Sequence, residues 1–210
     1  MTTTIHLSGP ADVLTVLPYQ LGFHPHDCLI VVSLHGSQMG LVQRVDLPPP
    51  EHVVQAVAAM LVPLRQNRPT AVLLIGFEGS EGQSRMMLDE MDDACLALPV
   101  KVADRLVVRG GRWFDLDCFQ SCCPPEGLPL PSPSEVPAVA EFVGREICPL
   151  PDRSALADLL ESNRPLLSRE VTRLADEWLQ LRQEATKAGE TELYGVRDSE
   201  LAVWSLVLSD

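Results

Sequence analysis

The sequence predicts an α/β protein in which a mixed β-sheet is covered by helices and followed by a helical C-terminal layer or lobe. Three observations predict this class. Apolar runs at 29–34, 41–47 and 71–77 are rich in the β-branched residues that favour strands. Segments with apolar residues at helical spacing separate these runs. Beyond residue 134, only helical patterns remain.

The order of these patterns predicts three regions. We expect an α/β domain over 1–123, a proline-rich connector over 124–134 and a helical region over 135–210 packed on the α/β domain. The connector is predicted because prolines fix the backbone and remove N–H donors. A chain of 210 residues can bury one sizeable core.

Composition and charge exclude several classes of function. With 46% hydrophobic and 21% charged residues, the chain has the make-up of a globular protein. Its formal charge of -13 repels phosphate backbones and anionic lipids, so we expect neither nucleic acid nor a membrane as a partner. The opening MTTTIHLSGP lacks the pattern of a signal peptide. We therefore expect a cytoplasmic protein whose six cysteines are reduced.

The first helix is predicted in SGPADVLTVLPYQLGF, with Ser8 as its N-cap and Pro10 in its first turn. Pro18 should kink this helix or end it early. A β-hairpin follows, because two apolar runs flank the polar stretch HGSQMG. In its second strand, Arg44 and Asp46 share one face, opposite Val45 and Leu47.

A second helix is predicted in EHVVQAVAAMLVPLRQNRP, residues 51–69, with Pro63 disturbing its last turn. The buried strand at 71–77 follows, and then a third helix that turns its methionines and Cys95 inward. Two further strands meet at a tight turn formed by Gly110 and Gly111. Arg109 and Arg112 then face each other, either at an exposed hairpin tip or around an anion or carboxylate.

Helices alone are predicted after the connector. Ser132-Pro133-Ser134-Glu135 has the pattern of a capping box that starts a helix through Val139 and Phe142. Ser168 should cap the longest helix. The apolar segment 199–210 ends without a cap, so we expect either that it docks fully or that the chain is cut short.

Four stretches carry a resemblance to a known family: SGPADVLTVLPYQLGFHPHDCLIVVSL, GLVQRVDLP, VRGGRWFDLDCFQSCCPPEGLP and SELAVWSLVLSD. Together they resemble the pattern of the actinobacterial domain-of-unknown-function family 4192. The resemblance implies no reaction, and it implies that members often continue beyond the end of this chain. Cys28 and Gly110 depart from the family pattern, which has serine and aspartate there. The residues that fit it are Pro10, Asp12, Pro18, Gly22, Phe23, His24, Pro25, Asp27, Arg44, Asp46, Pro48, Arg112, Trp113, Cys118, Cys122, Cys123, Pro124 and Gly127.

The first candidate site is the HPHD loop, residues 24–27, at the entrance of the first strand. His24 paired with Asp27 would suit a general base or a metal ligand. The alternative is structural, with Asp27 capping backbone amides and His24 packing. Arg44 and Asp46 form a second candidate, either as a salt bridge or as part of a site for a ligand with an anionic group, which Arg112 could join.

The third candidate is CFQSCCPPEGLP, with thiols at Cys118, Cys122 and Cys123. These residues predict a site for zinc or another soft metal, with a fourth ligand from His24, His26, Cys148 or a carboxylate. A redox-active disulfide between Cys118 and a later cysteine, or simply packed thiols, are the alternatives. The sequence contains no phosphate-binding loop, GxGxxG, HExxH or GxSxG motif, which disfavours nucleotide-driven motors and serine hydrolases.

Two functional hypotheses follow. In the first, the protein binds a small molecule or is a metal-assisted enzyme, with a pocket between the HPHD loop, the RVDL strand end and the cysteines; catalysis itself is left open. In the second, it is a non-enzymatic interaction or regulatory module. It would then form a homo-oligomer or bind a partner through its C-terminal helices, using Leu201, Trp204, Val207 and Leu208.

Overall fold

A computed structural model describes residues 7, 9–36, 38–162, 173, 176, 177 and 180. The chain divides into two compact units, 1–156 and 157–210. The helices are α1 (Pro10–Leu21), α2 (Val53–Asn67), α3 (Arg85–Cys95), α4 (Val139–Val143) and α5 (Arg153–Ser162), with short 3₁₀ helices at Pro50–His52 and Pro133–Glu135. The strands are β1 (Cys28–His35), β2 (Gln38–Asp46), β3 (Ala71–Phe77), β4 (Lys101–Arg109), β5 (Arg112–Asp115) and β6 (Leu128–Pro129).

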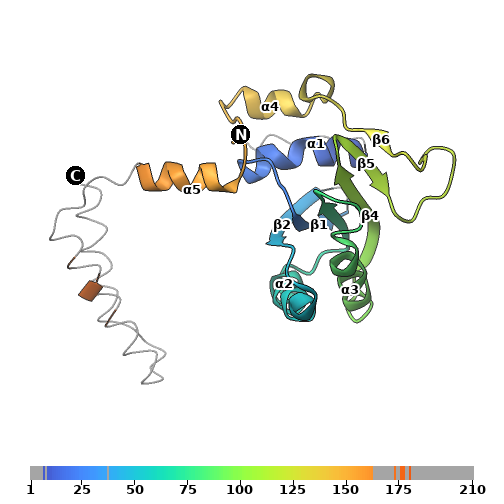
Figure 1. Ribbon diagram of the computed structural model, residues 1–210, viewed down its shortest axis with the longest axis horizontal. Coiled ribbons are helices and arrows are strands. Elements are labelled where there is room, and N and C mark those ends of the chain that lie inside the picture. Colours follow the sequence, from blue (N-terminus) through green and yellow to red (C-terminus); the bar gives the residue numbers. More distant parts are fainter. Residues whose placement is uncertain are drawn as a thin grey trace. The chain divides into compact units, whose positions relative to one another are not determined.

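One mixed sheet organises the first unit (Figure 1), in the order β2-β1-β3-β4-β5-β6. Strands β3 and β4 are parallel and are joined through α3, while the other neighbours are antiparallel. The predicted class, a mixed sheet covered by helices, is confirmed, as is the hairpin at Gly110 and Gly111. Because β3 and β4 are parallel, both end at the same edge of the sheet, next to the start of β1.

Helices α2 and α3 cover one face of the sheet (Figure 1). Alternate side chains of β1 and β3 point to this face, as strand geometry requires. The predicted inward positions of the third helix are confirmed, since Met87, Met91 and Cys95 are all buried. The residues of this layer include Leu29, Val31, Val57, Leu61, Leu64, Val72, Leu74, Met87, Leu88, Met91 and Val107.

Helix α1 covers the opposite face, packing Leu14 and Leu17 against Ile30, Ile75 and the other strand residues that alternate with the first set. Helix α4 then packs on α1 through Val16, Val139 and Phe142. The central strands β1 and β3 are therefore covered on both sides, which explains their continuous apolar sequences.

The two helix-interior prolines do not end their helices early, so the alternative in which Pro18 stops the first helix is wrong. Helix α1 continues through Pro18 to Leu21, and α2 continues through Pro63 to Asn67. A proline inside a helix costs about 3 kcal/mol. Each fully buried aliphatic side chain contributes about 1.5–3 kcal/mol, and α1 buries Leu14 and Leu17 completely. Burial of the apolar stripe therefore outweighs the proline penalty.

The region after β5 also differs from the prediction. The capping box at Ser132 and Glu135 is present, but it caps the short 3₁₀ helix, and α4 begins only at Val139. The predicted connector contains the two-residue strand β6, which pairs with β5. The predicted boundaries at 124 and 134 stay a prediction.

Several predictions fall on residues that the structure leaves undescribed. These are the Ser168 cap and the apolar segment 199–210 with its proposed role in oligomer or partner binding. The predicted N-cap at Ser8 is wrong, because α1 begins at Pro10 with Gly9 as its N-cap. Among the described residues, no helix is long and apolar enough to cross a membrane.

Candidate functional site

Three thiols converge in the cysteine loop, residues 118–127, which follows β5. The Sγ atoms of Cys118 and Cys122 lie 3.7 Å apart, and those of Cys122 and Cys123 lie 3.8 Å apart. All three sulfur atoms lie within 4.8 Å of one another. Cys122 is exposed and the other two are half-buried. One ion of ordinary thiolate-bound size could therefore contact all three sulfurs.

Carboxylates hold the beginning of this loop. Asp115 Oδ1 accepts hydrogen bonds from the backbone N–H groups of Asp117, at 2.9 Å, and Cys118, at 3.1 Å. Arg105 on β4 donates two hydrogen bonds to the Asp117 carboxylate. Such a forked pair fixes orientation as well as distance. The backbone at Cys118 is thereby tied to the sheet.

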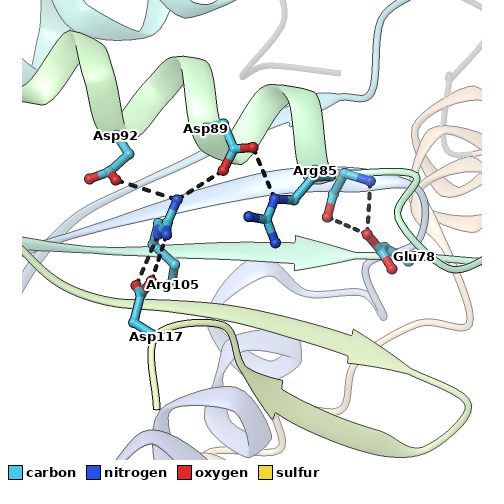
Figure 2. A network of polar contacts seen from close by, with 7 residues as sticks. Glu78, Arg85, Asp89, Asp92, Arg105 and Asp117 are labelled. Atoms are coloured by element: carbon cyan, nitrogen blue, oxygen red, sulfur yellow. Dashed lines mark hydrogen bonds and ion pairs between the residues drawn. The ribbon is translucent and has the colours of Figure 1, made fainter. Parts of the chain in front are cut away.

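Arg105 extends this anchor to α3. Figure 2 shows its guanidinium between Asp117 on one side and Asp89 and Asp92 on the other. The Asp89 carboxylate also accepts a hydrogen bond from Arg85. The hydrogen bonds from Arg105 hold the pKa of Asp117 below its ordinary value. The pKa of Arg105 rises chiefly through the same contact.

Arg112 holds the end of the loop. Its Nε donates to the carbonyl of Glu126 and its Nη2 to that of Gly127, both at 2.7 Å. Gly127 has φ of 72°, and an added Cβ would lie 2.6 Å from the Phe114 ring. A side chain at 127 would therefore need both a strained backbone and a displaced ring. Sequence reasoning placed Arg112 near a ligand, whereas its guanidinium contacts the loop backbone.

The three thiols differ in acidity. Hydrogen bonds from Cys123 and from the backbone of Gln120 lower the pKa of Cys118. The same contact raises the pKa of Cys123 to about 12, because its proton is shared with Cys118. Burial raises the pKa values of Cys28 and Cys95 to about 11. Thiolate character is thus favoured at Cys118, and thiolates are the form that binds metals.

A hollow of about 650 Å³ lies beside the cysteines, within the size range of small-ligand sites. Its wall includes Cys118 and Cys123, three aromatic side chains and the proline pair at 124–125. The aromatic residues are Trp113, Phe114 and Phe119, the last of which is 92% exposed. A ligand in this hollow would contact two of the three thiols.

The HPHD loop is held through its aspartate. Asp27 Oδ1 accepts a hydrogen bond from the backbone N–H of Gly79 at 3.0 Å, and the Asp27 carbonyl accepts one from Leu47 at 3.0 Å. Asp27 itself has a positive φ of 43°, a conformation that aspartate tolerates better than most residues. This geometry agrees with the structural alternative for Asp27.

The histidines of the loop lie elsewhere than the thiols. His24 and His26 are exposed and line a hollow of about 360 Å³ together with Glu78 and Arg109. The described residues make no hydrogen bond to either imidazole. The group of potential metal ligands found among these residues contains the three cysteines and does not include His24.

Arg44 and Asp46 form an ion pair at 2.6 Å, as one alternative for this strand end predicts. Asp46 also contacts Arg153 at 3.2 Å, and Arg44 lies over the Phe23 ring at 5.7 Å. The hydrogen bond from Arg44 lowers the pKa of Asp46. Neither Arg44 nor Asp46 lines the hollow beside the cysteines.

A buried ion pair at the ends of β3 and β4 was missed by sequence reasoning. Glu78, with its side chain 2% exposed, accepts hydrogen bonds from Arg109 at 2.8 Å and from both the N–H and the hydroxyl of Ser84. An added Cβ at Gly76 would lie 2.1 Å from the Ser84 hydroxyl, so only glycine permits this approach. The available signal was a carboxylate directly after the buried run AVLLIGF.

Comparison with known proteins identifies the family. A search of curated proteins found no match. A family model matches residues 10–209, nearly the whole chain, in agreement with the resemblance seen in the sequence. The chain therefore belongs to the family described as Domain of unknown function (DUF4192).

Proposed function

We propose that this protein binds one thiophilic divalent metal ion, zinc being the most suitable, through Cys118, Cys122 and Cys123, and that the ion helps to bind a small molecule. The observation that carries the proposal is the convergence of three sulfur atoms within 4.8 Å beside a hollow of about 650 Å³. Zinc accepts thiolate ligands readily, and sites with three protein ligands retain one open position.

The local chemistry supports this donor set. Two anchors, Asp115 and Arg112, hold the loop through its backbone and leave the sulfur atoms facing one another. When bound, a divalent metal acts as a Lewis acid at its open position. The aromatic wall of the hollow would offer apolar surface to a ligand, and Cys118 would supply the most easily formed thiolate.

The proposal has a consequence for location. Three adjacent thiols keep their metal-binding form only where disulfides do not form. We therefore propose that the protein acts in the cytoplasm, as its cysteine usage predicts. A small molecule is the partner proposed, without a reaction, because the residues described here form a binding site more clearly than an acid and base pair.

Cobalt titration tests the proposal directly. Co²⁺ added to tag-free, reduced protein should give the thiolate charge-transfer absorption at one equivalent, and Zn²⁺ should displace it. Cys118→Ser, Cys122→Ser and Cys123→Ser should each weaken metal binding by at least about tenfold, which is the smallest loss typical even of residues that only support a metal ligand. Cys148→Ser is the matched control, because Cys148 is an exposed thiol outside the cluster.

Two results would contradict the proposal. One is the absence of a stoichiometric cobalt signal in protein whose six thiols titrate as reduced. The other is an equal loss of affinity in Cys148→Ser and in the three cluster variants. If mild oxidation instead pairs Cys118 with Cys122 or Cys123 and no metal is bound under reducing conditions, the loop is a redox site.

A further inference from the structure

Three segments at one end of the sheet contain no acidic residue, although the chain contains 29 of them. The three segments meet there: 33–36 with 38–40, at the end of β1 and the start of β2; 64–70, at the end of α2; and 94–102, from the end of α3 to the start of β4. None of the three contains aspartate or glutamate. They do contain Arg65, Arg68 and Lys101, all of which are exposed. This end is therefore locally positive in a protein of charge -13.

Hydrogen bonds through Thr70 fix the three segments together. The backbone N–H of Thr70 donates to Leu34 at 2.9 Å, and its hydroxyl accepts from Gly36 at 3.0 Å. The N–H of Lys101 donates to the Thr70 carbonyl at 3.3 Å. The positive end is thus a built part of the fold, in which the ends of α2 and α3 are held beside each other.

An apolar groove of about 360 Å³ opens at this end. Leu64 forms its buried floor, and its other apolar residues are Pro69, Leu98, Pro99 and Val100. Arg65 and Arg68 stand on its rim. Within the described part of the chain, neither guanidinium forms an ion pair. The combination of an apolar floor, a small volume and two unpaired cations is that of a small-ligand site.

We infer that this groove, lined by 64–65, 68–70 and 98–100, binds a small amphiphilic anion. Its apolar part would lie on Leu64, Leu98 and Val100, and its carboxylate, sulfonate or phosphate group would accept hydrogen bonds from Arg65 and Arg68. Arginine suits all three anionic groups because its planar fork matches their oxygens. The inference is independent of the proposed metal site, since the two hollows share no residue.

A structural role for the arginines is the competing explanation. Basic residues near a helix C-terminus interact favourably with the helix dipole, and both arginines lie at the end of α2. This role accounts for their position and predicts a change in stability alone. Ligand binding predicts a change in affinity that depends on the charge of the ligand.

A pair of fluorescent probes separates the explanations. The anion 8-anilinonaphthalene-1-sulfonate and its neutral counterpart N-phenyl-1-naphthylamine have the same aromatic body. The sulfonate should bind saturably at one site per folded chain, and decanoate should displace it. The double variant Arg65→Gln, Arg68→Gln should weaken binding of the sulfonate by about tenfold or more. Its affinity for the neutral probe should be unchanged. Arg145→Gln is the control, because Arg145 is an exposed arginine outside the groove.

Pro99→Glu gives a second variant if the double change impairs folding. Pro99 is exposed on the groove, so a carboxylate there should repel the sulfonate without removing buried contacts. The inference is overturned if sulfonate binding is not saturable, if decanoate does not compete, or if the groove variants bind the sulfonate as tightly as Arg145→Gln. Because no metal is needed, the experiment is run with chelator, and its failure leaves the cobalt test unaffected.

Discussion

In the HPHD loop, the carboxylate of Asp27 accepts a hydrogen bond from the backbone of Gly79. In the cysteine loop, by contrast, the Asp115 carboxylate binds backbone N–H groups at the start of the loop, and the thiols are left facing one another. Both loops contain residues capable of chemistry. The fold uses the polar group of the first to connect two strands. It uses Asp115, Asp117 and Arg112 to present the sulfur atoms of the second.

The two loops differ in how far their polar groups are already engaged within the protein. The Asp27 carboxylate already accepts a backbone hydrogen bond within the protein, which reduces its capacity for a ligand. The side-chain hydrogen bonds of the thiols among the described residues join them to one another, and Cys118 and Cys123 line a hollow. The following variants test the comparison, beginning with the one expected to have the largest effect.

Removing the Arg109 cation beside Glu78 should destabilise the fold where β3 and β4 end, without changing metal binding by the cysteines. Arg109→Gln leaves a buried carboxylate without its ion-pair partner, which typically costs about 3–5 kcal/mol. Urea unfolding measures the loss, and cobalt stoichiometry should be unchanged. Adding Glu78→Gln should restore part of the stability. A loss no larger than that of exposed Arg65→Gln would show that Glu78 is not effectively buried.

Removing the anchor at the other loop should affect metal affinity more than folding. Arg112→Gln frees the carbonyls of Glu126 and Gly127, and changes in such supporting groups cost about 10–100-fold in metal affinity. Cobalt titration measures the change, with Arg145→Gln as the control. Unchanged affinity, together with normal unfolding, would mean that the loop holds its thiols without this anchor.

The ion pair between Arg105 and Asp117 should make the free energy of unfolding depend on pH in the acidic range. The pKa of Asp117 is lowered in the folded state, so its contribution is present above the unfolded value of about 3.9 and is lost as pH falls through the folded value. Asp117→Asn should therefore be less stable than the wild type at pH 6, and the two should converge as the pH falls through the lowered folded pKa of Asp117. Asp93→Asn, on an exposed part of α3, should show no such convergence. A gap between wild type and Asp117→Asn that is constant with pH would contradict this assignment.

The smallest effect is expected at His24. Its imidazole is exposed and forms no hydrogen bond among the described residues, so His24→Ala should change the free energy of unfolding by no more than about 0.5 kcal/mol. The cobalt spectrum should also be unchanged, since His24 lines the hollow with Glu78 and Arg109. A shift in that spectrum would make His24 the fourth ligand, as one sequence-based alternative had it.

The strands and most helices could be predicted because their signals are local. The run AVLLIGF is apolar throughout, and Met87, Met91 and Cys95 recur at helical spacing, so burial can be inferred from neighbours along the chain. The effect of prolines inside helices was harder to predict. Pro18 and Pro63 carry a local penalty that is outweighed by packing against the sheet, which a local pattern does not contain.

Some features of the candidate site could likewise be predicted from the sequence, and others could not. Sequence determined that three thiols lie within six residues, that prolines follow them and that the chain is strongly acidic. Tertiary structure decided which partner each charged side chain has. Asp27 meets Gly79 across 52 positions, and Arg109 meets Glu78 across 31. These partners depend on strand order and register, which bring distant residues together only after the sheet has formed.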